Sequence, residues 1–303
     1  YQKASAYLEK DYVSGIVNNS WGADYTYTYA DVDKDDKVLN LATSSDIPTL
    51  DLSKATDQQS FQTANTTMEG LTRVDAEGKV QPGVAESWET SEDGLTWTFK
   101  LRKNSTWSNG TPVTAHDFEY SWKRTLTPET AAEYSYIMAD IVGSSTKEIQ
   151  ENGVDGVGVK ALDDYTLEVK LNRPVAYFAE LVSFQVFFPQ NQAFVESCGD
   201  AYGSAADKQL YNGPFTLTSW KMEDQFTMEK NPNYWDAANV KLNKINTKVV
   251  KDTGAEVILY EDGQIDRAIL SSDYVDKYKD SKELKTREVA SIFMLQINGG
   301  NHK

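Results

Sequence analysis

The chain has 303 residues, of which 40% are hydrophobic, and this size and composition allow one large or two ordinary domains with sizeable cores. Forty-six Asp and Glu residues against 30 Lys and Arg give a net charge of −16, which repels phosphate backbones and anionic lipids and argues against nucleic-acid or membrane-surface partners. The sequence has no run of about 18 apolar residues, and no basic region followed by an apolar stretch at its start, so we expect neither a membrane-spanning helix nor a signal peptide.

The first elements along the chain are two strands joined by a charged connector. Alternating aromatic and small residues predict a strand over residues 25–29, and "VLNLA" predicts another over residues 38–42. Six of the seven residues at 31–37 are charged, which indicates a solvated linker. The pair therefore looks like the last strand of one domain followed by the first strand of another.

The rest of the chain mixes strands and helices. Apolar and polar residues alternate at 96–102, 165–171 and 215–220, which predicts half-buried strands. Helical spacing follows Thr114, a plausible N-cap, and two shorter helices are predicted at 177–182 and 190–197. The spacing of four tryptophans indicates core positions: Trp88, Trp97, Trp107 and Trp122.

Catalytic and metal-binding motifs are incomplete in this sequence. Asp31, Asp33 and Asp35 match a calcium loop, but Asp36 stands where the loop needs glycine. The G-x-G-x-x-A match at 156–161 is preceded by polar residues and followed by a strand pattern, so we interpret it as a loop entering a strand and not a dinucleotide site.

The reactive side chains are equally isolated. His116 and His302 are the only histidines, and Cys198 is the only cysteine, so a zinc site would lack ligands and an internal disulfide cannot form. No motif pairs Cys198 with a histidine base, and no G-x-S-x-G sequence is present. The pattern favours a binding protein without cofactors or metal over an enzyme.

A series of motifs in fixed order is more specific than any of these features. It runs "LDLSKATDQQS", "MEGLTRVDAEGKVQPGVAESWETSEDGLTWTFKLRKNSTWSNGTPVTAHDFEYSW", "GVKALDDYTLEVKL", "YNGPF" and "NPNYWD". The series resembles the oligopeptide-binding proteins of ABC importers and covers nearly the whole chain. Most of these residues are expected to act in turns and in the core.

The resemblance implies that the order of segments is rotated. Residues 3–17, "KASAYLEKDYVSGIV", resemble the family's closing return segment, and residues 38–51 resemble its mature N-terminal strand. "REVASIFMLQINGGN" resembles the strand that leaves the first lobe through the hinge. We expect a circular permutation in which residues 31–37 join the family's natural C-terminus to its natural N-terminus. The chain would then be an engineered single lobe that lacks the second lobe. The alternative is a natural protein with a rearranged order of segments.

The fold expected from the resemblance is a mixed α/β lobe of the type II periplasmic-binding-protein kind, with a mixed central sheet flanked by helices and an inserted α+β subdomain. The main lobe would comprise residues 1–68 and 188–303, and the inserted subdomain residues 69–187. In the main lobe, 1–30 would be the return segment, 31–37 the joining linker and 38–68 the family's N-terminus. The main sheet would contain residues 25–29, residues 38–42, strands between 211 and 250, and a hinge strand at 285–298.

The resemblance also implies that the parent protein binds short peptides between two lobes, mainly through the peptide backbone. The ligand contacts carried over to this chain are Ala55, Thr56, Asp57, Gln58, Tyr134, Phe293, Met294 and Tyr1. The family has an acidic residue in place of Thr56 and a glycine in place of Asp57, so backbone contacts are the ones expected to persist there. For Tyr134 and the three hinge residues, an ordinary packing role is the alternative.

A single lobe leaves half of the cleft open, so we expect weakened or lost peptide binding. The alternative is a scaffold that self-associates, or binds another protein, through the exposed cleft face. The resemblance implies an ABC permease as partner of the parent and an extracytoplasmic location, with the parent a cell-surface lipoprotein of a Gram-positive bacterium. An enzyme of unrecognised type remains the competing class.

Overall fold

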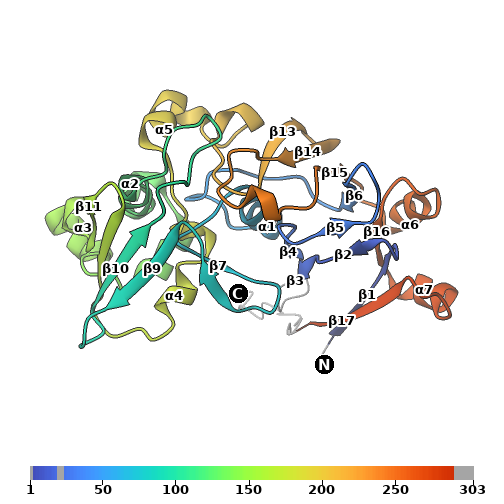
Figure 1. The fold of residues 1–303 in the computed structure, drawn as a ribbon, viewed down its shortest axis with the longest axis horizontal. Helices are drawn as coiled ribbons and strands as arrows, with labels where there is room; N and C mark the ends of the chain where they lie inside the picture. The colour runs from blue at the N-terminus through green and yellow to red at the C-terminus, as the bar shows by residue number, and fades with distance from the viewer. Residues whose placement is uncertain (1–2, 19–23, 290–303) are drawn as a thin grey trace, which may run out of the picture.

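The computed structural model describes residues 3–18 and 24–289. The fold is mixed α/β, with two four-stranded sheets, a three-stranded sheet and three two-stranded ones among the described residues. Figure 1 shows one four-stranded sheet with its helices at one end, the three-stranded sheet at the other, and helix α1 (Gln58–Thr67) between them. The expected fold class is confirmed.

The tryptophan-rich sheet is antiparallel and has the order β11-β12-β10-β9. The strand patterns at 96–102 and 165–171 are confirmed, and the four bounds are β9 (Ala85–Thr90), β10 (Thr96–Leu101), β11 (Val159–Asp163) and β12 (Thr166–Lys170). Trp97, Trp107 and Trp122 are buried and Trp88 packs half-buried against the same core. The core role predicted for the tryptophans therefore holds.

Helix α2 (Ala115–Leu126) lies against this sheet and begins as the sequence predicts. Thr114 is its N-cap, and the Thr114 N–H donates to the Asp117 carboxylate at 2.8 Å. Further helices of this part of the chain are α3 (Thr146–Asn152), α4 (Phe178–Leu181) and α5 (Gln192–Cys198). The last two are the short helices that the spacing predicts. The hairpin β7 (Thr72–Val74) and β8 (Val80–Pro82) connects this part to α1.

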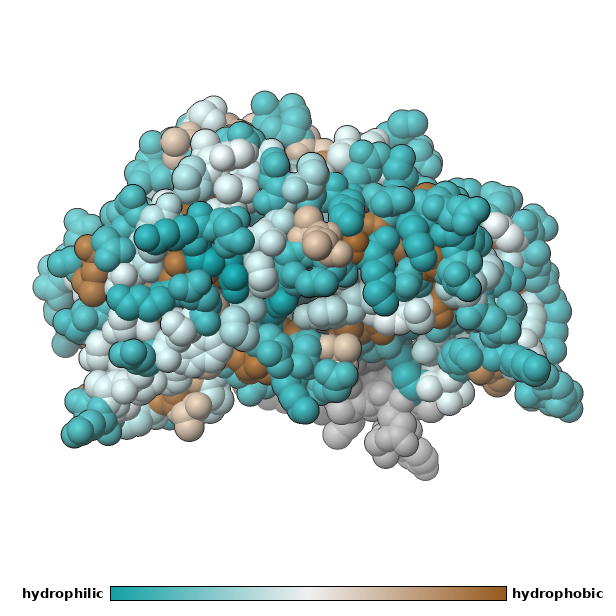
Figure 2. Space-filling view, viewed as in Figure 1, coloured by the Kyte–Doolittle hydropathy of each residue, from teal (hydrophilic) through white to brown (hydrophobic). Residues whose placement is uncertain are grey.

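The second four-stranded sheet is mixed and has the order β13-β14-β15-β6. Its members are β13 (Phe215–Lys221), β14 (Gln225–Lys230), β15 (Lys244–Val249) and β6 (Val38–Thr43). β6 and β15 run parallel, with Leu41 opposite Thr247, so their carboxyl ends meet at one edge. One continuous core runs from this sheet into the tryptophan-rich sheet, and Figure 2 shows that the face of the molecule outside it is mostly hydrophilic, with scattered hydrophobic residues. The division into a main lobe and an inserted subdomain stays a prediction.

The three-stranded sheet joins opposite ends of the sequence. β1 (Lys3–Glu9) lies between β16 (Arg267–Leu270) and β17 (Leu284–Val289) and pairs antiparallel with both. Helices α6 (Thr253–Glu261) and α7 (Ser272–Val275) accompany it, and a separate small core forms beneath from Leu8, Val257, Tyr260, Ile265, Ala268 and Leu270.

The predicted composition of the main sheet is wrong in two places. Residues 25–29 do not join the sheet of 38–42: β4 (Asp24–Thr26) pairs with β3 (Val17–Asn18) in a sheet of its own. The strand ends at Thr26 because the chain turns, and the Ala30 N–H donates to the Tyr27 carbonyl at 3.1 Å. The hinge strand at 285–298 is β17 as far as it is described, and it pairs with β1 instead of the main sheet.

The charged connector at 31–37 is more ordered than a solvated linker. β5 (Asp31–Val32) pairs with β2 (Val13–Ser14), and Val32 is completely buried. Lys34 Nζ lies 3.3 Å from the buried carboxylate of Asp266. The high charge of residues 31–37 predicts a solvated linker, and this prediction is wrong in part, because Lys34 pairs with the buried Asp266 and Val32 is buried.

Helix α1 is buried although its sequence, QQSFQTANTT, is almost entirely polar. Its threonine hydroxyls donate to carbonyls one turn earlier: Thr63 to Gln59 at 2.8 Å, Thr66 to Gln62 at 2.9 Å, and Thr67 to Thr63 at 2.8 Å. A buried hydroxyl is costly only when it lacks a partner, so these bonds allow a polar helix to occupy the centre of the molecule.

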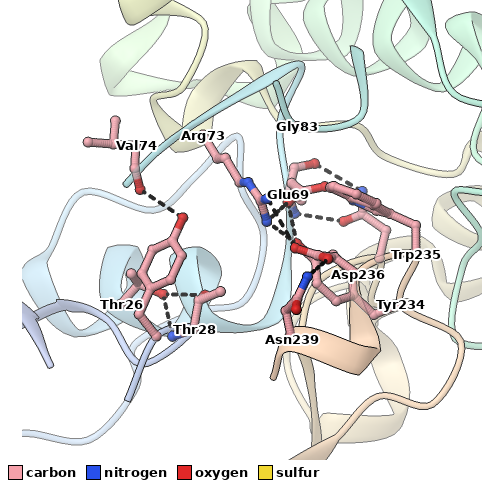
Figure 3. A network of polar contacts seen from close by, with 12 residues as sticks. Thr26, Thr28, Glu69, Arg73, Val74, Gly83, Tyr234, Trp235, Asp236 and Asn239 are labelled. Carbon is pink, nitrogen blue, oxygen red and sulfur yellow. Dashed lines mark hydrogen bonds and ion pairs between the residues drawn. The ribbon is translucent and has the colours of Figure 1, made fainter. Parts of the chain in front are cut away.

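The end of α1 is fixed by the buried carboxylate of Glu69 (Figure 3). Tyr234 and Trp235 each donate a hydrogen bond of 2.5 Å to it, and Arg73 lies 3.6 Å away. The Glu69 backbone is held as well, because Asn212 accepts from its N–H at 3.0 Å and donates to its carbonyl at 2.9 Å. Burial raises the pKa of Glu69, while Arg73 and the two hydrogen bonds oppose the rise.

Replacing Glu69 with glutamine tests the contribution of these contacts to stability. The amide keeps the shape, but it turns an N–H₂ group toward a donor and removes the charge opposite Arg73. We expect Glu69→Gln to lower the free energy of unfolding by about 3 kcal/mol. Urea unfolding measures this, with Glu89→Gln on exposed β9 as the matched control, for which a change of about 0.5 kcal/mol or less is expected. Equal stability of the two variants would contradict the role given to Glu69.

Candidate functional site

A cavity of about 380 Å³ opens where the carboxyl end of β6 meets the start of α1. In sheets with parallel strands, ligands commonly bind outside the carboxyl ends of the strands. Much of the lining is polar but uncharged, and the charged groups come from α6, β16 and β17. The lining residues used below are Tyr27, Thr43, Ser44, Gln58, Gln59, Gln62, Glu256, Arg267, Ile269 and Arg287. We refer to this cavity as the cleft.

The start of α1 is positioned by two interactions. Asp57 is the N-cap, and its carboxylate accepts from the Ser60 N–H at 2.8 Å. Six residues earlier, Asp51 is buried and accepts two hydrogen bonds from Arg124 of α2, at 2.7 and 2.8 Å. This bidentate pair fixes the loop before α1 to the tryptophan-rich part of the fold.

The four predicted contacts before and at the start of α1 face different directions. Ala55 is buried, and its N–H donates to the Asp51 carbonyl at 2.9 Å. Thr56 is exposed, Asp57 is half-buried in its capping role, and Gln58 lines the cleft. Of these four residues, Gln58 is the one that lines the cleft, and the ligand contacts expected from all four stay a prediction.

Tyr134, on the short helix η2 (Glu133–Met138), belongs to an aromatic cluster on another face of α1. Its ring lies 5.5 Å from Phe61 of α1 in an edge-to-face contact and 5.9 Å from Phe184. Tyr136 stacks on it at 5.8 Å and is 69% exposed. Since Phe61 lies one residue before Gln62 of the cleft wall, α1 connects the cluster to the cleft. Phe293, Met294 and Tyr1 lie outside the described residues.

Sequence reasoning missed the charged part of the cleft. Glu256 of α6 is almost buried, its carboxylate accepts from the Ile269 N–H at 2.7 Å, and Arg267 of β16 lines the same cavity. Burial raises the pKa of Glu256 to about 7, against the opposing effects of that hydrogen bond and of the Arg267 charge. One feature of the sequence could have pointed to Glu256: it stands four residues before Tyr260, so the two lie on the same face of the helix, and Tyr260 packs into the core.

The reactive side chains considered for catalysis lie elsewhere. Cys198 is half-buried at the end of α5, and His116 on α2 lies 3.4 Å from Asp164. Neither is among the residues that line the cleft. The cleft offers hydroxyl, amide, carboxyl and guanidinium groups, which suit hydrogen bonding to a ligand.

Comparisons with known proteins agree with this architecture. A sequence profile described as bacterial extracellular solute-binding proteins, family 5, middle part, matches residues 79–302. The oligopeptide-binding protein OppA of Bacillus subtilis is 37% identical over 249 residues, which are 80% of this chain and 46% of OppA. The dipeptide-binding protein DppE of the same organism is 35% identical over 87% of this chain and 48% of its own length.

Solved structures give the same result. The substrate-binding domain of an oligopeptide ABC transporter from Bacillus anthracis matches with a TM-score of 0.81 and 47% identity, covering 82% of this chain and 48% of that one. Listeria monocytogenes OppA bound to peptide matches with a TM-score of 0.80 and 42% identity, covering 82% of this chain and 49% of that one.

The chain belongs to family 5 of the bacterial extracellular solute-binding proteins. It spans about half the length of the curated relatives it matches, 46% for OppA and 48% for DppE. Relatives in this family are binding proteins found outside the cytoplasm. Within residues 3–18 and 24–289, we find no helix with the length and apolarity needed to cross a bilayer.

The raised pKa of Glu256 predicts that the stability of the protein depends on pH. The pKa of Glu256 in the folded protein, about 7, lies above the usual 4.5. Glu256 therefore does not lower the free energy of unfolding below pH 4.5, lowers it increasingly as the pH rises to 7, and lowers it by the full amount above pH 7. The difference between these pKa values corresponds to about 3 kcal/mol. Glu256→Gln keeps the acceptor for Ile269 and removes the charge, so we expect it to match the wild type at pH 4 and to exceed it by about 2–3 kcal/mol at pH 8.

Urea unfolding of both proteins at pH 4, 6 and 8 measures this difference. Glu151→Gln, at an exposed position near the end of α3, is the control and should follow the wild type at each pH. A difference between Glu256→Gln and the wild type that does not change with pH would contradict the assignment.

Proposed function

We propose that this chain is a non-catalytic peptide-binding lobe of an ABC-importer binding protein. The observation that carries the proposal is the cleft itself, an open cavity at the carboxyl ends of β6 and β15 that is lined by Gln58 at the start of α1. The names of the relatives support peptides as the ligand class, since OppA and DppE are named for oligopeptide and dipeptide binding.

The chemistry of the lining supports a ligand read mainly through its backbone. Thr43, Ser44 and Gln58 offer hydroxyl and amide groups, which can hydrogen-bond to peptide N–H and C=O groups directly or through water. Such contacts do not depend on the side chains of the peptide, so the cleft would tolerate varied sequences.

We propose that this chain alone binds peptides weakly. It matches about half the length of relatives such as OppA, and one lobe covers less of a peptide than a closed pair of lobes. The parent protein would work with an ABC permease. It would be a surface lipoprotein of a Gram-positive bacterium, which the matches to Bacillus subtilis and Lactococcus lactis proteins support.

The segment order supports a circular permutation. β1, near the start of the described chain, is inserted between β16 and β17 from its last part, as a returning strand would be. In this proposal the order of segments is engineered, and residues 31–37, which include β5, join the family's C-terminal segment to its N-terminal one.

Superposition on peptide-bound Listeria OppA tests the permutation. With β13–β15 and α1 aligned, we expect β1 to coincide with a strand from the last third of the Listeria sequence. A strand from its first third in that place, or no strand, would contradict the permutation and leave the binding proposal untouched.

Peptide binding is tested by ¹⁵N NMR titration with a mixture of unrelated pentapeptides at millimolar concentration. We expect shifts at Thr43, Gln58 and neighbouring cleft residues, with dissociation constants weaker than micromolar. Ser44→Trp should block the cleft, whereas Ser204→Trp, at an exposed position outside it, should not.

The possible outcomes separate the parts of this proposal. No shift at millimolar peptide would contradict peptide binding, and micromolar or tighter binding by the monomer would contradict the expected weakness. Sedimentation at two protein concentrations checks the alternative of self-association through the cleft face, where Ile269 is 49% exposed. A dimer that excludes peptide would favour that alternative.

A further inference from the structure

Four polar side chains form a continuous chain of hydrogen bonds along the wall of the cleft. Thr43 Oγ1 of β6 donates to Gln59 Oε1 of α1 at 2.8 Å, and Gln59 Nε2 donates to Gln62 Oε1 at 3.1 Å. Gln62 Nε2 in turn donates to the Tyr27 hydroxyl. All four residues line the cleft, and the two glutamines meet because residues three apart on a helix lie on the same face.

Gln62 is the member of this chain that suits a ligand. Gln59 is only 8% exposed, whereas Gln62 is half-buried at the surface of the cleft. Among the described residues, the partners of the Gln62 amide are Gln59 and Tyr27, and rotation of the amide would break both bonds. A glutamine amide has two N–H donors and an oxygen with two lone pairs. Gln62 therefore keeps one donor and one acceptor position for a ligand, on a group whose orientation is already fixed.

One residue of an extended peptide offers the matching pair of groups. Its N–H and its C=O point to the same side of the chain, as in the closely spaced hydrogen-bonded pairs of an antiparallel sheet. A glutamine amide can accept from that N–H and donate to that C=O, and neither bond depends on the peptide side chain. Because the amide is held before the ligand arrives, less conformational entropy is lost on binding.

We propose that Gln62 holds one residue of an extended peptide by two backbone hydrogen bonds, accepting at Oε1 from its N–H and donating from Nε2 to its C=O. The inference rests on the proposed peptide-binding function and deepens it, because it assigns recognition of the backbone N–H to one side chain on α1. A ligand with an ester bond in place of the peptide bond at this point loses one of the two hydrogen bonds.

The side-chain amide signals of Gln62 in ¹⁵N NMR spectra report this contact directly. The ligands are pentaalanine and its ester analogue, in which lactic acid replaces residues 2–5 so that no amide N–H remains in any register. We expect millimolar pentaalanine to shift the Nε2–H₂ signals of Gln62, and the ester analogue to shift them less. Gln150, at an exposed position on α3 outside the cleft, should not respond to either ligand.

Substitution of Gln62 measures its share of the preference for pentaalanine over the ester analogue. Gln62→Met keeps the length of the side chain and removes both hydrogen-bonding groups. We expect the ratio of the two dissociation constants to fall about fivefold in Gln62→Met, as for the loss of one hydrogen bond, and to stay unchanged in Gln150→Met. A general loosening of the cleft weakens both ligands alike and leaves this ratio unchanged.

Circular dichroism checks the folding of each variant, and the Gln62 signals of the wild type decide the question if Gln62→Met does not fold. Binding of pentaalanine that leaves these signals in place would overturn the role of Gln62 and leave peptide binding intact. So would a ratio that is the same in Gln62→Met as in the wild type, or that falls equally in Gln150→Met. Absence of pentaalanine binding at millimolar concentration would overturn the peptide-binding function, and the role of Gln62 with it.

Discussion

The hydrogen bonds and ion pair of the buried Glu69 carboxylate are the interactions on which the arrangement around α1 depends. Three distant parts of the sequence meet there: Asn212 holds its backbone, Tyr234 and Trp235 donate to its side chain, and Arg73 balances its charge. A charge in this position is tolerated only because it is paired and hydrogen-bonded, so the contacts must form together. The "YNGPF" and "NPNYWD" motifs, which look like turn signals in the sequence, have this additional structural role.

Glu69 lies two residues after α1, so the same interaction sets the position of that helix. The other end of α1 is fixed by the Asp57 cap and, through the preceding loop, by the pair between Asp51 and Arg124. Both ends of a polar, buried helix are therefore restrained, and its first turn carries Gln58 into the cleft. A ligand that is recognised through its backbone requires such fixed groups, because each contact is weak and none can be lost to loop motion.

The cleft combines two kinds of chemistry. Hydroxyl and amide groups at the end of β6 and the start of α1 suit peptide backbone, whereas charge is supplied by Arg267 and Arg287 of the sheet that contains β1 and by Glu256 of α6. β1 lies between the strands that carry the two arginines, and both guanidinium groups lie over the ring of its Tyr7.

The sequence by itself determined the elements whose signal is local: the alternating strands β10, β12 and β13, helix α2 with its N-cap, the core tryptophans, and the family, whose motifs stand in order along the chain. Only the tertiary structure decided which strands pair. It separated residues 25–29 from β6, packed the charged connector against Asp266, buried the polar α1, and brought Glu256 and the two arginines into one cavity. Local periodicity reports which side of an element is apolar, but it does not report the long-range partners that satisfy a buried hydroxyl or charge.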